Sequence, residues 1–89
     1  MNLAEIIEEI LNQIDLGPFG WADLDYILMQ NIDLDIYTRD EILAELDKQA
    51  TKRTILIQIT EDVAQEITIW ATREVSDDDI IKYYEETIL

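Results

Sequence analysis

Carboxylates are the only abundant side chains in this sequence that could carry chemistry. The 89-residue chain has 21 aspartate and glutamate residues against 6 lysine and arginine residues, and it has neither histidine nor cysteine. Histidine and cysteine hold most zinc sites, and histidine is the usual base of a hydrolytic triad. The composition therefore excludes both kinds of site in their usual form, so that any site must be built from carboxylates.

Two segments partly resemble a calcium-binding loop. A loop that begins at Asp33 needs glycine at its sixth position and glutamate at its twelfth, but Thr38 and Ala44 stand there. A loop that begins at Asp77 fails as well, because its twelfth position is Ile88. We therefore expect no metal site and no cofactor.

Catalysis by a pair of carboxylates is also not expected. Glycoside hydrolysis uses such a pair, but it needs a cleft that encloses the sugar. A chain of 89 residues forms one modest core and leaves little material to enclose a substrate. The two glycines flank Pro18 and Phe19 in a turn and do not form a phosphate-binding loop. We expect a protein that binds a partner and is not an enzyme.

The number and spacing of the acidic residues favour a role in binding. A net charge of −15 exceeds the magnitude of about 2–8 that keeps a small domain soluble. Carboxylates three or four positions apart on a helix lie about 5–6 Å from each other, a spacing not far from that of neighbouring phosphates on a nucleic-acid strand. The acidic residues that could form such rows are Glu5, Glu8, Glu9, Asp23, Asp25, Asp33, Asp35, Asp77, Asp78 and Asp79.

These rows predict an inhibitor that imitates DNA or RNA and binds a basic, nucleic-acid-binding protein such as a nuclease, a restriction enzyme or a CRISPR effector. In composition the chain resembles small, acidic, cysteine-free phage inhibitors of the anti-CRISPR and anti-restriction type. A simpler interpretation is that the acidic residues only solvate the surface. An antitoxin, an immunity protein or a subunit of a complex is a further alternative, and self-association is left open.

Four of the six basic residues lie between residues 38 and 53, and they define a rival function. A transcriptional regulator could use this segment to contact DNA phosphates. The segment carries as many acidic as basic residues, which would cancel most of the attraction, and we expect no direct binding to nucleic acid. The basic residues of this alternative site are Arg39, Lys48, Lys52 and Arg53.

The chain is expected in the cytoplasm, which would be the host cytoplasm for a phage-encoded protein. No apolar run approaches the ~18 residues that span a bilayer, and the first residues lack the basic start of a secretion signal. The absence of cysteine fits a reducing compartment. An anionic membrane surface would repel a chain of this charge.

The elements that must position these residues begin with two helices. Residues 2–14 repeat isoleucine and leucine at helical spacing, and Asn2 with Glu5 fits a capping box. The stretch 15–21 holds both glycines and the only proline, so it is expected to turn and to fold Phe19 and Trp21 back onto the core. A second helix is expected over 21–31.

A third helix, a hairpin and a final helix are expected in the remainder of the chain. Thr38 and Glu41 fit a capping box that begins the third helix. Residues 54–60 alternate as a strand, whereas residues 61–75 fit either a strand or a helix. Their β-branched residues favour a hairpin that turns near 61–65. Ser76 then caps a helix over 77–88. These elements predict a single, mostly helical α+β domain over residues 1–89, in the order helix, helix, helix, strand, strand, helix.

This order resembles the winged helix-turn-helix arrangement over roughly residues 22–72. The residues that carry the resemblance are Thr38, Ile42 and Leu46 on the third helix, followed by the strand from Thr54. The pattern departs where its next apolar position falls on Gln49 and where its usual glycine is Arg53. The resemblance implies a helical body with a β-hairpin and DNA binding through the third helix.

Overall fold

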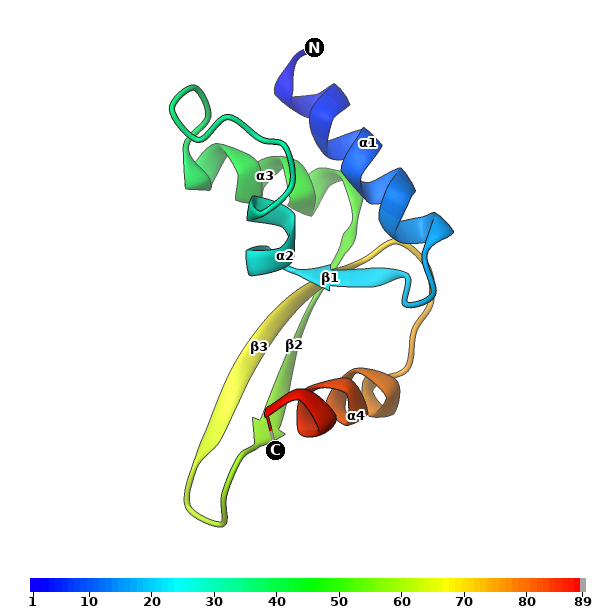
Figure 1. The fold of residues 1–89 in the computed structure, drawn as a ribbon, viewed down its shortest axis with the longest axis vertical. Coiled ribbons are helices and arrows are strands. Elements are labelled where there is room, and N and C mark those ends of the chain that lie inside the picture. The colour runs from blue at the N-terminus through cyan, green and yellow to red at the C-terminus, as the bar shows by residue number, and fades with distance from the viewer. Residues whose placement is uncertain (89) are drawn as a thin grey trace.

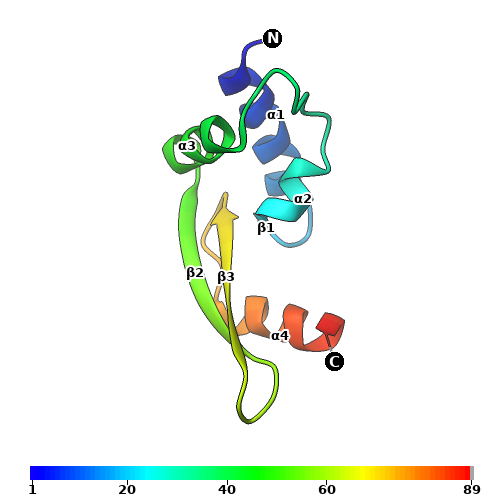
Figure 2. The ribbon, with the colours of Figure 1, turned by 90° about the vertical axis from the view of Figure 1, so that its left-hand side faces the viewer.

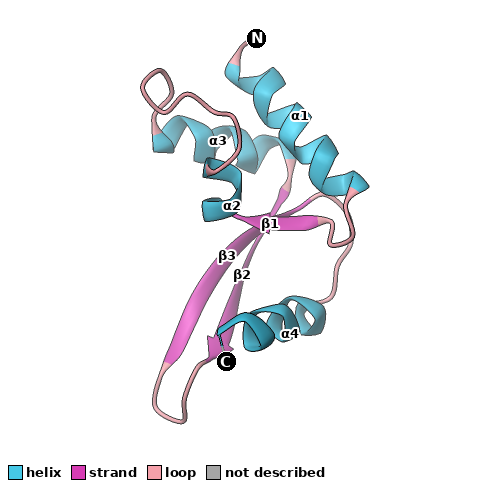
Figure 3. Ribbon diagram, in the orientation of Figure 1, coloured by secondary structure: helices cyan, strands magenta, loops and turns pink. Residues whose placement is uncertain are grey.

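Four helices and three strands follow one another in the part of the chain that the structure describes, residues 1–88 of a computed structural model. The fold is α+β, as the sequence predicts (Figures 1 and 3). The elements are α1 (Leu3–Leu16), β1 (Trp21–Asp23), α2 (Leu24–Leu28), α3 (Arg39–Gln49), β2 (Thr51–Gln58), β3 (Ala64–Ala71) and α4 (Asp77–Ile88).

β3 is the central strand of an antiparallel sheet in the order β1-β3-β2. β2 pairs with β3 over its whole length, from Thr51 opposite Ala71 to Gln58 opposite Ala64. β1 pairs only with the last residues of β3, beginning with Trp21 opposite Ala71. The far end of the hairpin therefore projects from the body of the molecule (Figure 1). The whole molecule, hairpin included, measures 45 × 26 × 19 Å.

The sheet separates two hydrophobic cores. One core lies among α1, α2, α3 and Trp70, which is buried together with Ile27 and Ile42. The other lies between the sheet and α4, where Ile69 and Ile80 are buried. Successive side chains of a strand point to opposite faces, so that the neighbours Ile69 and Trp70 serve different cores. Two views of the ribbon show α4 beside the hairpin and α3 at its upper end (Figures 1 and 2).

The expected helix over 21–31 is wrong in its bounds, because residues 21–23 form β1 and the helix covers only Leu24–Leu28. Asp23 is the N-cap of α2, and its side chain accepts a hydrogen bond of 2.9 Å from the N–H of Tyr26. An N-cap residue has an extended backbone, which starts the helix late. Gly20, directly before β1, has a φ of 75°. This left-handed conformation turns the chain so that Trp21 lies alongside β3.

The other elements follow the local signals in the sequence. Both predicted capping boxes are present, at the start of α1 and at the start of α3. The hairpin is confirmed, although β2 begins at Thr51 and therefore includes Lys52 and Arg53. The hydroxyl of Ser76 accepts a hydrogen bond of 3.2 Å from the N–H of Asp79, as expected at the start of α4. In residues 1–88 no helix combines the length and the apolar character needed to cross a membrane.

Candidate functional site

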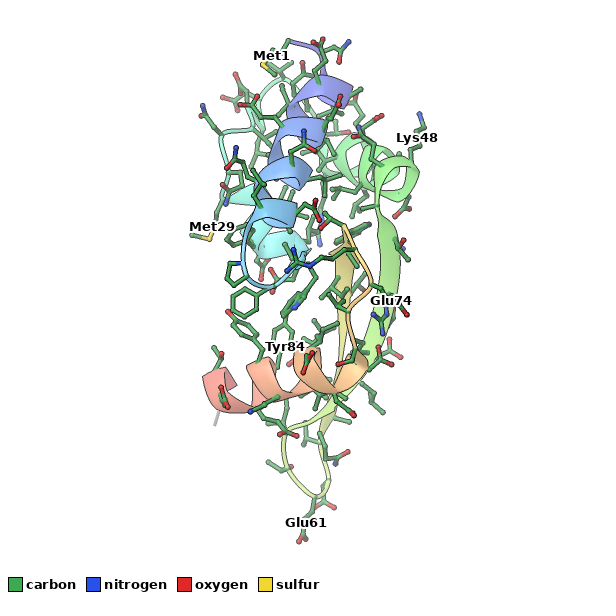
Figure 4. All side chains as sticks on the ribbon, turned by 90° about the vertical axis from the view of Figure 1, so that its right-hand side faces the viewer. Met1, Met29, Lys48, Glu61, Glu74 and Tyr84 are labelled. Atoms are coloured by element: carbon green, nitrogen blue, oxygen red, sulfur yellow. The ribbon has the colours of Figure 1, made fainter. Side chains whose placement is uncertain are left out.

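The acidic side chains lie almost entirely on the surface. Nineteen of the 21 are exposed, and only Asp23 and Glu45 are partly buried. They occupy all four helices, the loop between α2 and α3 and the hairpin, so that negative charge covers both ends of the elongated molecule. Figure 4 shows side-chain oxygens around the whole outline of the molecule, with Glu61 at the tip of the hairpin.

The row predicted on α1 is present. Glu5, Glu8 and Glu9 are exposed, because Ile7 and Leu11 take the buried face of this helix. Glu5 also accepts a hydrogen bond of 3.3 Å from the N–H of Asn2, which fixes the first turn. The exposed Asp15, on the last turn of α1, adds a further carboxylate to the helix. Its surface therefore carries several carboxylates and no basic side chain.

Asp33 and Asp35 lie in the loop between α2 and α3, and both are exposed. The carboxylate of Asp33 accepts a hydrogen bond of 3.0 Å from the N–H of Asp35, which folds the loop into a tight turn. Leu34 and Ile36, which alternate with these acids, are also exposed. The loop thus presents negative and apolar side chains together.

The three aspartates of α4 differ in their surroundings. Asp77 forms an ion pair with Arg53, so its charge is partly neutralised within the molecule. Asp78 and Asp79 are exposed and form no ion pair with any described residue. Glu85 and Glu86 add two exposed carboxylates further along the helix.

Asp23 also has a structural role within the protein. It is half-buried, and it accepts hydrogen bonds from the N–H of Tyr26 at 2.9 Å and from the hydroxyl of Tyr84 at 2.6 Å. Burial, followed by the hydrogen bond to Asp23, raises the pKa of Tyr84 well above its ordinary value. No basic side chain of residues 1–88 forms an ion pair with Asp23. Asp25, two positions along, is exposed as expected.

The basic residues of the alternative DNA site do not form one surface. Arg53 is half-buried, donates a hydrogen bond to the carbonyl of Val75 and pairs with Asp77, so that it holds β2 against the start of α4. Lys48 lies 3.8 Å from a carboxylate oxygen of Glu45. Only Arg39 and Lys52 are brought together, in a hollow that is also lined by the acidic residues Asp23, Asp25 and Glu66.

Sequence reasoning missed the role of Arg73. Its guanidinium donates hydrogen bonds to the carbonyls of Asp15 at 2.6 Å, Gly17 at 3.2 Å and Pro18 at 3.0 Å. Arg73 therefore holds the turn between α1 and β1 in place. No local signal could have indicated this role, because Arg73 lies more than fifty positions along the chain from the turn.

A cluster of aromatic rings was also missed. Trp21 is buried as expected, but Phe19 is 52% exposed, which corrects the expectation that it folds into the core. Phe19 and Trp21 each lie against Tyr83 of α4, with ring centroids 5.4 and 5.3 Å apart. Beside these rings is a depression of about 260 Å³, the aromatic hollow, whose lining includes Pro18, Phe19, Trp21, Asp23, Tyr26 and Tyr83. The one local signal was the Tyr83-Tyr84 pair, of which only one ring can face inward.

The surface described above is therefore composed of exposed carboxylates and a few exposed aromatic rings. Residues 1–88 contain no group of three or more carboxylates close enough to hold a metal ion. Comparisons with protein-family models, with curated protein sequences and with solved structures find no match to this chain.

Proposed function

We propose that this protein is a non-enzymatic binding module that inhibits a basic, nucleic-acid-binding protein by imitating DNA or RNA. The observation that carries the proposal is the imbalance of available charge. Nineteen carboxylates are exposed, whereas two of the six basic side chains, Arg53 and Arg73, bind backbone carbonyls of the protein itself. The charge that remains for a partner is strongly negative.

The shape of the molecule supports this role. Its longest dimension of 45 Å exceeds one helical turn of B-DNA, which is about 34–36 Å. Carboxylates occur on α1 at one end and on α4 towards the other, so the protein could follow an extended basic groove. A field of this sign accelerates association with a positively charged partner by about 10–10³-fold at low salt. A nuclease, a restriction enzyme or a CRISPR effector presents a groove of the required charge.

Direct binding of DNA through α3 is less well supported, although the element order resembles a winged helix-turn-helix. The exposed part of α3 carries Asp40 and Glu41 beside Arg39 in its first turn. The hollow that contains Arg39 and Lys52 also contains three carboxylates. Phosphates would therefore meet mixed charge at α3 and repulsion elsewhere.

The acidic surface is tested by replacing carboxylates that form no ion pair within residues 1–88. One variant carries Asp33→Asn and Asp35→Asn, and a second carries Asp78→Asn and Asp79→Asn. Asparagine retains the turn that Asp33 forms, and Asp77 is left unchanged because it pairs with Arg53. Each variant should bind a partner purified on the immobilised wild-type protein about threefold to tenfold more weakly at low salt. Its thermal midpoint should be nearly unchanged.

The control for this experiment replaces exposed basic residues of α3. Arg39→Gln with Lys48→Gln should leave partner binding unchanged or strengthen it, because both changes make the protein more negative. Unchanged affinity in both acidic variants would rule out the proposal. Weaker partner binding in the basic variant, together with retention of duplex DNA by the wild-type protein, would favour the regulator instead.

A further inference from the structure

The aromatic hollow differs from the rest of the acidic surface because its walls are rings. Phe19 and Tyr26 are each 52% exposed, and Tyr83 is also exposed, although each has a large apolar body that folding could have covered. The rings of Phe19, Trp21 and Tyr83 lie within 5.9 Å of one another, at interplanar angles of 59° to 83°. This packing holds the walls in place and leaves part of the ring surface open to solvent.

Asp23 is the acidic residue among those that line the hollow. Asp23 lies beside the rings, half-buried, and its two oxygens accept hydrogen bonds from the N–H of Tyr26 and the hydroxyl of Tyr84. Both donors are uncharged, and none of the basic side chains in residues 1–88 pairs with Asp23. Each carboxylate oxygen can accept a second hydrogen bond. The negative charge is thus fixed in position and forms no ion pair within residues 1–88, although Arg39 and Lys52 line a second hollow with Asp23.

The dimensions of the hollow suit one side chain. Its volume of about 260 Å³ lies below the range of about 300–1,000 Å³ that is typical of small-molecule sites. Aromatic faces attract cations, and they attract a planar guanidinium more readily than an ammonium because it can also stack. A carboxylate binds the same guanidinium through charge-assisted hydrogen bonds.

We propose that the aromatic hollow is an anchoring pocket for an arginine side chain of the partner. The inference rests on the proposed function, because it assigns one position on the acidic surface to one residue type of the basic protein. In the bound state the guanidinium stacks on Phe19 or Tyr83 and donates hydrogen bonds to Asp23. The surrounding carboxylates attract the basic partner electrostatically, while the arginine bound in the hollow fixes the position in which the partner docks. Trp, Tyr and Arg are the residue types that most often dominate binding at protein interfaces.

The proposal is tested with a blocked peptide, acetyl-Gly-Arg-Gly-amide, and a matched peptide in which lysine replaces arginine. Backbone and indole N–H resonances of the ¹⁵N-labelled protein are followed by NMR as each peptide is added. The arginine peptide should shift the resonances of Phe19, Trp21, Asp23 and Tyr83 most strongly and should bind more tightly than the lysine peptide. Equal, diffuse shifts with the two peptides would overturn the proposal, because general attraction to negative charge does not distinguish them.

Two variants separate the ring from the carboxylate. Phe19→Leu keeps an apolar side chain but removes the aromatic face. It should lower the affinity for the arginine peptide about twofold to fivefold. Asp23→Asn keeps an N-cap residue for α2 but removes the charge. It should lower the affinity for the arginine peptide about tenfold. Leu56→Ala, an exposed apolar residue on the hairpin and outside the hollow, is the control and should have no effect. If neither Phe19→Leu nor Asp23→Asn lowers the affinity for the arginine peptide, the proposal is wrong.

The same variants distinguish this inference from the proposed function. If Phe19→Leu and Asp23→Asn bind the purified partner normally while Asp33→Asn with Asp35→Asn binds it weakly, the arginine pocket is wrong and the acidic inhibitor stands. If the arginine peptide occupies the hollow but no basic protein binds the chain, the proposed function is wrong and the pocket stands.

Discussion

The hydroxyl of Tyr84 donates a hydrogen bond of 2.6 Å to the carboxylate of Asp23, which lies 61 positions earlier in the chain. The same carboxylate caps α2, so that one aspartate connects the N-terminal body to the last helix. Tyr84 is buried against Trp21, with ring centroids 5.7 Å apart, on the face of the sheet that α4 covers. Figure 4 shows Tyr84 on the side of α4 that faces the body. The contact fixes one wall of the aromatic hollow, and the predictions begin with it.

Replacing Tyr84 with phenylalanine should destabilise the fold. The change removes a partly buried hydrogen bond to a charged group, which is worth about 1.5–3 kcal/mol. For a domain of this size each kcal/mol corresponds to about 4–8 °C in the thermal midpoint. Thermal unfolding followed by circular dichroism measures the effect. Tyr83→Phe is the matched control, because no hydrogen bond of the Tyr83 hydroxyl occurs within residues 1–88, and it should cost less than about 0.5 kcal/mol. Equal losses of stability in Tyr84→Phe and Tyr83→Phe would contradict the assigned role of Tyr84.

The protein should lose stability above about pH 10. Burial and the bond to Asp23 raise the pKa of Tyr84 above its ordinary value of 10.0, so the folded state keeps a proton that the unfolded chain releases near that pH. The contribution is fully present below pH 10 and decreases as the pH rises further. Urea unfolding at pH 8, 10 and 11 measures the decrease, which should be smaller in Tyr84→Phe. Parallel loss in the wild-type and variant proteins would exclude Tyr84 as the cause.

Arg53 should matter for stability, whereas its neighbour Lys52 should not. Arg53→Gln removes the hydrogen bond to the carbonyl of Val75 and the ion pair with Asp77, whose side chain is 60% exposed. Because an exposed ion pair contributes little, we expect a loss of about 1–2 kcal/mol, mostly from the hydrogen bond. Lys52→Gln should change the free energy of unfolding by less than about 0.5 kcal/mol. A larger effect at Lys52 would show that the two roles have been assigned wrongly.

Salt should stabilise the protein. With a net charge of −15 the folded state suffers more self-repulsion than the expanded chain, and screening relieves it. Between about 20 and 500 mM NaCl, which shortens the Debye length several-fold, the thermal midpoint should rise by several degrees. A midpoint that falls with salt would mean that ion pairs such as Arg53–Asp77 outweigh the repulsion.

The parts of the fold that could be predicted from the sequence are those set by local interactions. The capping boxes of Asn2 with Glu5 and of Thr38 with Glu41 each join residues three positions apart, and both are present. Helical apolar spacing similarly predicted α1, capping residues predicted the starts of α3 and α4, and alternation with β-branched residues predicted the β2–β3 hairpin. These signals are contained in short windows of sequence, so no tertiary information is needed to detect them.

The features that escaped prediction depend on contacts between distant segments. Strand β1 is only three residues long and exists because β3 provides a partner for it. Asp23 could be recognised as an acid but not as the partner of Tyr84, and Arg73 could not be connected with the turn before β1. The aromatic hollow likewise joins residues near position 19 with residues of α4. Apart from Asp23, which is half-buried, the acids of the predicted set are exposed, since hydration of charge requires no particular partner.

Competition with DNA tests the central claim most directly. The immobilised protein is incubated with a lysate of the source cell at low salt, and bound proteins are eluted with an excess of duplex DNA at constant salt. A nucleic-acid-binding protein should elute with the DNA, and it should be lost from a column that carries Asp33→Asn, Asp35→Asn, Asp78→Asn and Asp79→Asn together. If DNA releases no protein, or if labelled duplex DNA is itself retained by the immobilised protein, the proposal of nucleic-acid mimicry is wrong.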